Sequence, residues 1–294
     1  KIMKAAHEKG VKLRGHTLVW HQQTPKYFFQ QNYKITTGQK YNTSKECMDT
    51  RLEFYVKTVM NHVLSSEYAD CLYSYDVVNE YLHSANAEKD SKNITYWGLI
   101  YGTYDKSVKD HGVTLRPSYV KDAFKYAHEM LVKYDRLDVK LIYNDYNCYQ
   151  NPENIIHLVD YINSEGKVCD GIGMQSHLDI TDSFHSATNY AKALEYFRLN
   201  CPDLEIQITE LDATMVSTED KPLTDEDQAA YYDQIMGALL QSKAKGTKIS
   251  ALVIWSLYDG VSWRPAKFPC LFNGLYMPKA AFYAVIDAKK QYWD

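Results

Sequence analysis

The feature of this chain that most restricts its fold is a regular alternation of short apolar strands with longer amphipathic helices. No linker, repeat or low-complexity segment interrupts the alternation. Strands and helices that alternate in this way form parallel sheets through right-handed crossovers, so one domain over residues 1–294 is expected. The expected strands are residues 11–20, 72–80, 139–146, 171–177, 205–210 and 249–256. The expected helices are residues 1–9, 44–64, 96–101, 118–133, 152–164, 187–199, 224–245 and 279–292, and residues 81–115 are otherwise expected to be irregular.

Side chains that can form hydrogen bonds stand at the ends of nearly all these strands: His16, His21, Glu80, Asn144, Asp145, His177, Glu210 and Trp255. In a (β/α)8 barrel such strand ends converge on one rim, where barrel active sites lie. This favours an α/β (β/α)8 TIM barrel over the structural alternative, an open doubly wound sheet. Because eight strands close a barrel well, the six found here predict an N-terminally incomplete barrel. Two strands and a helix are then expected upstream of Lys1 or on a separate segment.

Charge and composition exclude several function classes. The net charge is -4, and Lys and Arg are spread along the chain, so there is no basic footprint for nucleic acid. No apolar run is long enough to cross a bilayer, and the N-terminus has no signal-peptide pattern. The six cysteines have neither CxxC nor metal-ligand spacing, so free thiols and no cofactor are expected, with a disulfide between distant cysteines left open.

Two expected strands each deliver a carboxylate, Glu80 and Glu210. An unpaired carboxylate at the end of a buried strand is unfavourable, so a pair of them indicates chemistry, and two carboxylates are what the hydrolysis of a glycosidic bond needs. His177 and Asp212 could fix the orientation and charge of Glu210, which favours Glu210 as the nucleophile. Glu80 then becomes the acid/base, and Asn79 beside it is placed to contact the sugar 2-hydroxyl.

These glutamates and histidines also have structural, metal-binding and hydrolase interpretations. A single Glu at a strand end is more often a solvated rim residue, and a single His is more often a core residue. The histidines 16, 21 and 177 could form a metal site with the two glutamates, but no HxH or HExxH spacing supports one. A serine hydrolase is disfavoured because the chain has no GxSxG motif.

Six segments resemble, in order and spacing, the strand-end motifs of glycoside hydrolase family 10, the retaining endo-1,4-β-xylanases. They are RGHTLVWHQQTP (14–25), YDVVNE (75–80), YNDYN (143–147), GIGMQSH (171–177), ITELD (208–212) and WSLYDGVSWR (255–264). The resemblance implies a hydrolase that cleaves internal β-1,4-xylosidic bonds of xylan by double displacement. It assigns the acid/base to Glu80 and the nucleophile to Glu210.

The resemblance also implies further residues and partners. Substrate-binding roles fall on His16, Trp20, Gln23, Asn79, Tyr146, Asn147, Gln175, Trp255 and Trp263. The family's first two strands are not found here, so they are expected from an N-terminal segment, with an inserted carbohydrate-binding module of the same polypeptide as one arrangement. Because xylan is a polymer, an extracellular, cell-surface or periplasmic location is expected. The alternatives are a β-1,4-glucanase on a related barrel and a catalytically idle carbohydrate-binding barrel.

Overall fold

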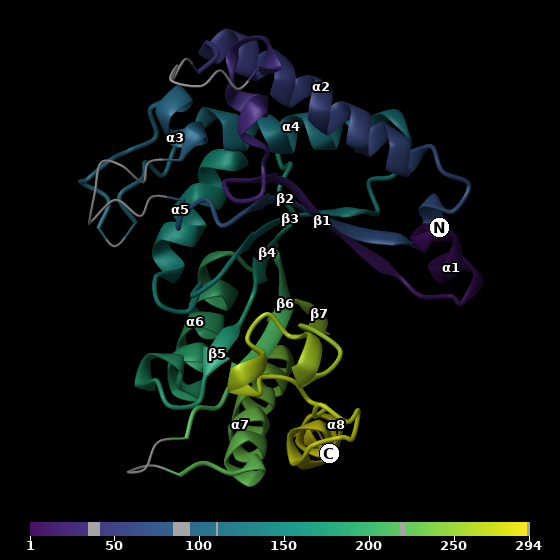
Figure 1. The fold of residues 1–294 in the computed structure, drawn as a ribbon. Coiled ribbons are helices and arrows are strands. Elements are labelled where there is room, and N and C mark those ends of the chain that lie inside the picture. Colours follow the sequence, from purple (N-terminus) through teal and green to yellow (C-terminus); the bar gives the residue numbers. More distant parts are fainter. Residues whose placement is uncertain (35–41, 85–94, 110, 218–221, 293–294) are drawn as a thin grey trace. The chain divides into compact units, whose positions relative to one another are not determined.

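The computed structural model describes residues 1–34, 42–84, 95–109, 111–217 and 222–292 (Figure 1). They form two compact units. Unit 1 comprises Lys1–Asp145 and His157–Gly171, and unit 2 comprises Tyr146–Ile156 and Ile172–Asp294. The segment of expected irregular structure, residues 81–115, falls partly on 85–94 and 110, which lie outside the described residues. None of the helices within the described ranges is both long and apolar enough to cross a membrane.

Unit 1 is built on three parallel strands in the order β1, β2, β3. Its elements are α1 (Ile2–Glu8), β1 (Leu13–Trp20), α2 (Lys45–Leu64), β2 (Leu72–Asn79), α3 (Tyr96–Tyr101), α4 (Ser118–Lys133) and β3 (Lys140–Asp145). The register pairs Trp20 with Asn79 and Asn79 with Asn144. The carboxyl ends of the three strands therefore lie in line, and Glu80 follows directly after the middle one.

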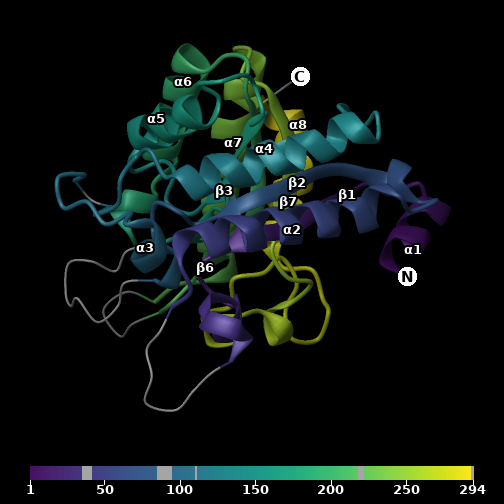
Figure 2. The same cartoon turned by 90° about the horizontal axis from the view of Figure 1, so that it is seen from above.

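Helices α2 and α4 lie side by side, and α4 packs against β2 and β3 (Figure 1, Figure 2). The Ser44 side chain accepts a hydrogen bond from the backbone N–H of Cys47 and so begins α2. Along α2, Met48, Leu52, Val56, Met60 and Leu64 are buried at every fourth position. This spacing places them on one face of the helix, and their burial holds the helix against the unit.

The ring of Tyr75 on β2 lies directly on the backbone of Gly15, its register partner on β1. A Cβ atom at position 15 would come within 2.4 Å of this ring, which is closer than van der Waals contact allows. The side chain of Tyr75 is buried, so it has little room to move away. Glycine is therefore required at position 15 by close approach of the ring.

Unit 2 contains a parallel sheet in the order β4, β6, β5, with β7 paired to β6. Its elements are β4 (Gly171–Met174), β5 (His177–Asp179), α6 (Ala187–Asn200), β6 (Glu205–Thr214), α7 (Asp225–Ala244), β7 (Ile249–Ile254) and α8 (Ala280–Tyr292). Helix α7 packs against α6 and α8, and a capping box of Thr224 and Asp227 begins it. Helix α5 (Pro152–Ile162) is divided between the units, with its first residues in unit 2 and the rest in unit 1.

The expected parallel α/β arrangement is confirmed within each unit, but two strand predictions were wrong. The single strand expected over residues 171–177 is two short strands, because Ser176 has a positive φ of 64° that interrupts the extended chain. The strand expected to end near Glu210 continues to Thr214. It does so because Asp212, Ala213 and Thr214 pair with β5.

Candidate active site

Glu80 lies one residue beyond β2, where its backbone adopts a left-handed conformation with a φ of 57°. This conformation is unusual for a residue other than glycine and turns the chain sharply at the end of the strand. Its side chain is buried, and the indole N–H of Trp20 donates a hydrogen bond of 2.8 Å to its Oε2. The register of β1 against β2 brings this tryptophan and glutamate together although they are 60 residues apart.

Two amides line up beside Glu80 at the ends of β2 and β3. The side-chain amide of Asn144 donates a hydrogen bond of 2.9 Å to Oδ1 of Asn79, and both residues are buried. The backbone N–H of Glu80 also donates to the carbonyl oxygen of Asn144. Asn79 and Glu80 are thus fixed by β3 as well as by their own strand.

His16 is oriented by Asp76, which is fully buried inside β2. Asp76 Oδ2 lies 2.9 Å from His16 Nδ1, and its Oδ1 accepts a hydrogen bond of 2.5 Å from Arg14 Nη2. The positive guanidinium offsets the unfavourable burial of the carboxylate. Asp76 and Arg14 were not among the residues expected at the site. The position of a charged residue, Asp76, in the middle of an otherwise apolar strand could have indicated its role.

A second network surrounds the carboxylate of Asp145, the last residue of β3. His83 Nδ1 lies 2.7 Å from Asp145 Oδ1, and the hydroxyl of Tyr143 donates to Oδ2 of the same carboxylate. Burial opposes the charged form of His83, but the Asp145 carboxylate raises the His83 pKa above its usual value. For His21, burial dominates and lowers the pKa to about 4, and its Nδ1 finds no partner among the described residues.

In unit 2, Glu210 is the first of a row of three side chains. His177 Nε2 lies 3.0 Å from Glu210 Oε2, and His177 Nδ1 lies 2.9 Å from Asp212 Oδ1. Burial alone would lower the His177 pKa, but its hydrogen bonds to the two carboxylates raise it to about 9. His177 is therefore an imidazolium at neutral pH, and it donates one N–H to each carboxylate. The side chains of Asp212, His177 and Glu210 thus form the row expected from the sequence.

The aromatic residues expected around Glu210 are brought to it in unit 2. The indole N–H of Trp263 donates to Asp212 Oδ2 at 2.8 Å, and the Trp263 ring centroid lies 4.7 Å from that of His177. Trp255 lies further away, with its ring centroid 6.2 Å from His177. Gln175 is buried in the break between β4 and β5, and its carbonyl oxygen accepts from the backbone N–H of Glu210.

The other expected substrate-binding residues are less tightly held. Gln23 is exposed, in the loop after β1, and has a positive φ of 58°. Tyr146 and Asn147 follow β3 and are half-buried. The hydroxyl of Tyr149 donates a hydrogen bond of 2.9 Å to Asn147 Oδ1. Unit 1 brings together His16, Trp20, Asn79 and Glu80. Unit 2 brings together Gln175, His177, Glu210, Asp212, Trp255 and Trp263.

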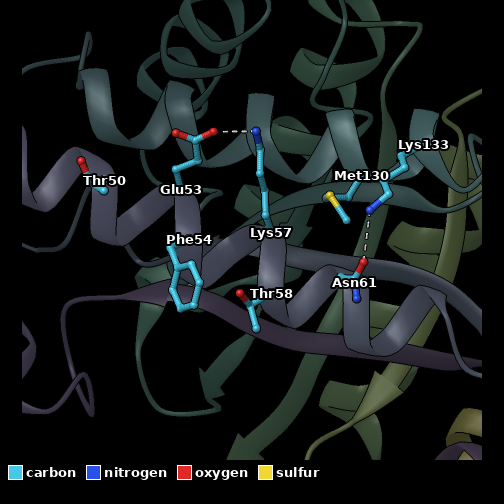
Figure 3. A pocket seen from close by; sticks show the side chains of 8 residues that line it. All are labelled: Thr50, Glu53, Phe54, Lys57, Thr58, Asn61, Met130 and Lys133. Atoms are coloured by element: carbon cyan, nitrogen blue, oxygen red, sulfur yellow. Dashed lines mark hydrogen bonds and ion pairs between the residues drawn. The ribbon is translucent and has the colours of Figure 1, made fainter.

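A shallow pocket between α2 and α4 holds none of these residues. It has a volume of about 470 Å³ and is lined by Thr50, Glu53, Phe54, Lys57, Thr58, Asn61, Met130 and Lys133 (Figure 3). Lys57 pairs with Glu53, and Lys133 donates to the side chain of Asn61. Its charged groups thus pair within the protein. In the described ranges there is also no group of three or more His, Cys, Asp or Glu side chains arranged to hold a metal ion.

A family profile and individual relatives assign this chain to the same protein family. The profile of glycosyl hydrolase family 10 matches residues 1–288. Endo-1,4-beta-xylanase A of Butyrivibrio fibrisolvens is 39% identical over 289 residues, covering 98% of this chain and 63% of that protein. This chain thus spans less than two thirds of the length of that relative.

Two solved structures have the same fold. The N-terminal CBM22-1 and GH10 modules of Clostridium thermocellum endo-1,4-beta-D-xylanase 10B, in complex with xylohexaose, match with a TM-score of 0.78 at 30% identity. The match covers 97% of this chain and 53% of that chain. An intracellular xylanase of Thermoanaerobacterium saccharolyticum, bound to xylotriose, matches with a TM-score of 0.75 at 30% identity. The match covers 97% of this chain and 78% of that chain. The fold class is therefore the (β/α)8 TIM barrel of these proteins.

Proposed function

Because the chain belongs to glycosyl hydrolase family 10, we propose that it is an endo-1,4-β-xylanase that hydrolyses internal bonds of xylan with retention of configuration. The observation that carries the proposal is the hydrogen-bonded row of Asp212, His177 and Glu210. An imidazolium held by one carboxylate and directed at another suits a carboxylate nucleophile. It holds the Glu210 side chain in one orientation.

The proposed reaction has two steps. In the first, Glu210 forms a bond to the anomeric carbon while the bond from that carbon to the leaving oxygen breaks, and Glu80 gives its proton to this oxygen. In the second, Glu80 takes a proton from a water molecule, whose oxygen displaces Glu210 from the sugar. Both steps invert the anomeric carbon, so the net result is retention.

The neighbours of each carboxylate support these roles. Glu80 accepts from the neutral indole N–H of Trp20, which places the carboxyl group without fixing its charge. Asn79, held by Asn144, offers an amide to the sugar 2-hydroxyl. Trp20, Trp255 and Trp263 carry flat faces of the kind that stack on pyranose rings, and His16, Gln23, Tyr146, Asn147 and Gln175 offer polar groups to hydroxyls.

Three wider proposals follow. One family profile matches residues 1–288, which supports residues 1–294 acting as one catalytic domain. The Clostridium thermocellum relative combines CBM22-1 and GH10 modules, which supports a carbohydrate-binding module in the same polypeptide. An extracellular location is supported by the polymeric substrate alone, since the Thermoanaerobacterium relative is described as intracellular.

The test is to follow hydrolysis of xylohexaose by proton NMR while identifying products over time. We expect the β-anomer to appear first, with xylotriose and other internal fragments as early products. First release of the α-anomer would contradict the retaining mechanism. Higher kcat/KM on carboxymethylcellulose than on xylan would support the glucanase, and binding of xylohexaose without turnover would support the binding barrel. Glu210→Gln is the control for contaminating activity.

A further inference from the structure

The carboxylate of Asp212 is fully buried, and both of its oxygens accept hydrogen bonds from ring N–H groups. His177 Nδ1 donates to Oδ1 at 2.9 Å, and Trp263 Nε1 donates to Oδ2 at 2.8 Å. A buried carboxylate is stable only when its charge is paired and its oxygens are satisfied. The indole N–H is therefore part of what keeps Asp212 charged and in one orientation.

The row continues from Asp212 to the nucleophile. His177 uses Nδ1 for Asp212 and Nε2 for Glu210, so the imidazole orientation is set from both sides. The Trp263 ring also lies on that of His177, with the planes inclined by 57°. Trp263 thus reaches His177 in two ways, through the Asp212 carboxylate and through ring contact.

Trp263 is itself held by buried contacts of its loop. Asp259, four residues earlier, forms an ion pair of 3.4 Å with Lys279, and both side chains are buried. Asp259 Oδ1 also accepts the backbone N–H of Cys270. These contacts fix the loop, and Trp263 remains 52% exposed. The guanidinium of Arg264 lies over the Trp263 ring, 3.8 Å from its centroid. One residue therefore has an anchored N–H and a partly exposed ring.

We propose that Trp263 is a positioning residue for the nucleophile Glu210, acting through Asp212 and His177, in addition to offering a face to the sugar. This inference rests on the proposed function, in which Glu210 attacks the anomeric carbon. A sugar that contacts the exposed part of the indole contacts the same ring that fixes Asp212. Occupation of this binding site and the geometry of the nucleophile are thereby linked.

The charged and titratable groups around Asp212 set the expected direction of the pH effect. They are His177 of β5, Glu210 of β6 (the strand of Asp212 itself), Tyr232 of α7 and Cys270 of the C-terminal loop. Without the indole N–H, the negative charge of Asp212 is stabilised by fewer donors, so this group of side chains holds protons more tightly. The acidic limb of the kcat/KM profile should then move to higher pH.

The experiment replaces Trp263 with 3-benzothienylalanine, which keeps the size and face of the ring and removes the N–H, and compares Trp263→Phe. On an aryl β-xylobioside, we expect kcat/KM to fall about tenfold, the effect of losing a hydrogen bond to a charged group. The acidic limb should shift upward and KM should change little. Trp255→Phe is the matched control, because its ring also neighbours His177 and it should leave the acidic limb in place.

A rise in KM with an unchanged pH profile would overturn the proposal and leave Trp263 as a sugar platform alone. A second measurement separates this outcome from failure of the proposed function. In the 15N NMR titration of His177, which needs no activity, we expect the midpoint to rise in the benzothienyl variant. An unchanged midpoint would overturn the inference whether or not the protein cleaves xylan.

Discussion

The two carboxylates Glu80 and Glu210 sit in different surroundings, one in each unit. Glu80 follows a strand in a left-handed conformation and accepts from the neutral indole of Trp20. Glu210 lies inside β6, in extended backbone, and faces the imidazolium of His177. A neutral donor places a carboxyl group that must gain and lose a proton, whereas a cation fixes one that must stay charged. The difference between the two surroundings thus supports the two proposed roles.

The largest effect is expected from Glu210→Ala. Removing the nucleophile should lower kcat on an aryl β-xylobioside by at least about four orders of magnitude, the scale seen for other covalent nucleophiles. Added azide can then attack the substrate from the vacated side, which gives an α-xylosyl azide that NMR identifies. The control is Glu195→Ala, which removes a half-buried ion pair with Arg198 on α6 and should leave kcat unchanged. A β-azide from the Glu210 variant would reverse the two assignments.

A smaller loss, which depends on the substrate, is expected from Glu80→Ala. On xylan, loss of the proton donor should lower kcat/KM by about 10²–10⁴-fold. On a dinitrophenyl xylobioside, kcat/KM should stay within about tenfold, because this leaving group hardly needs a proton. Azide should restore kcat and give a β-xylosyl azide. Equal losses on both substrates would contradict the acid/base role.

The pH dependence of the unfolding free energy should report on the His177 network in unit 2. The pKa of His177 is raised to about 9, so the stability it contributes is complete below its ordinary value of 6.5 and is lost as the pH rises through about 9. The difference in unfolding free energy between wild type and His177→Gln should fall by on the order of 3 kcal/mol between pH 6 and pH 10. Urea unfolding at each pH measures it.

The control for this measurement is His62→Gln, at an exposed position on α2. Its difference from wild type should stay within about 0.5 kcal/mol over the same range. A His177 difference that stays equally flat would mean that the imidazolium is not held by the two carboxylates.

The smallest expected effect is a difference in the free energy of unfolding that depends on the backbone conformation at positions 80 and 210. At position 80 the left-handed φ of 57° favours glycine, so Glu80→Gly should be more stable than Glu80→Ala by about 1 kcal/mol. At position 210, inside a strand, Glu210→Gly should be less stable than Glu210→Ala by about 0.5–1 kcal/mol. Thermal unfolding of the four variants gives both signs. The same sign at both positions would contradict the contrast between the two backbones.

The parts of this site that could be predicted from the sequence were those set by local pattern. His177 and Glu210 stand at or near the ends of apolar runs, and the parallel pairing of β5 with β6 brings them together. Glu80 directly follows the apolar run of β2. The contact of Arg14 with Asp76 could not be predicted, because it depends on which residues of two strands 62 positions apart stand opposite each other.

The interruption of a strand at Ser176 was also missed, since serine gives no strong signal for a positive φ. The length of β6 depended on the same feature. Because β5 begins anew at His177, the chain beyond Glu210 still has a partner, and the strand continues to Thr214. The first error arose from the local backbone conformation of Ser176, and the second arose because pairing with β5 overrode the local pattern.

Because Tyr75 contacts Gly15, the residues that can be accommodated at these two positions, 60 residues apart in the sequence, depend on each other. No side chain can be added at position 15 while an aromatic ring occupies position 75, but a smaller residue at 75 would open the space. A lineage can therefore enlarge position 15 only after position 75 has become smaller, because in the reverse order a Cβ atom overlaps the ring of Tyr75. The order of substitutions at these two sites is constrained by geometry rather than by chemistry at the catalytic carboxylates.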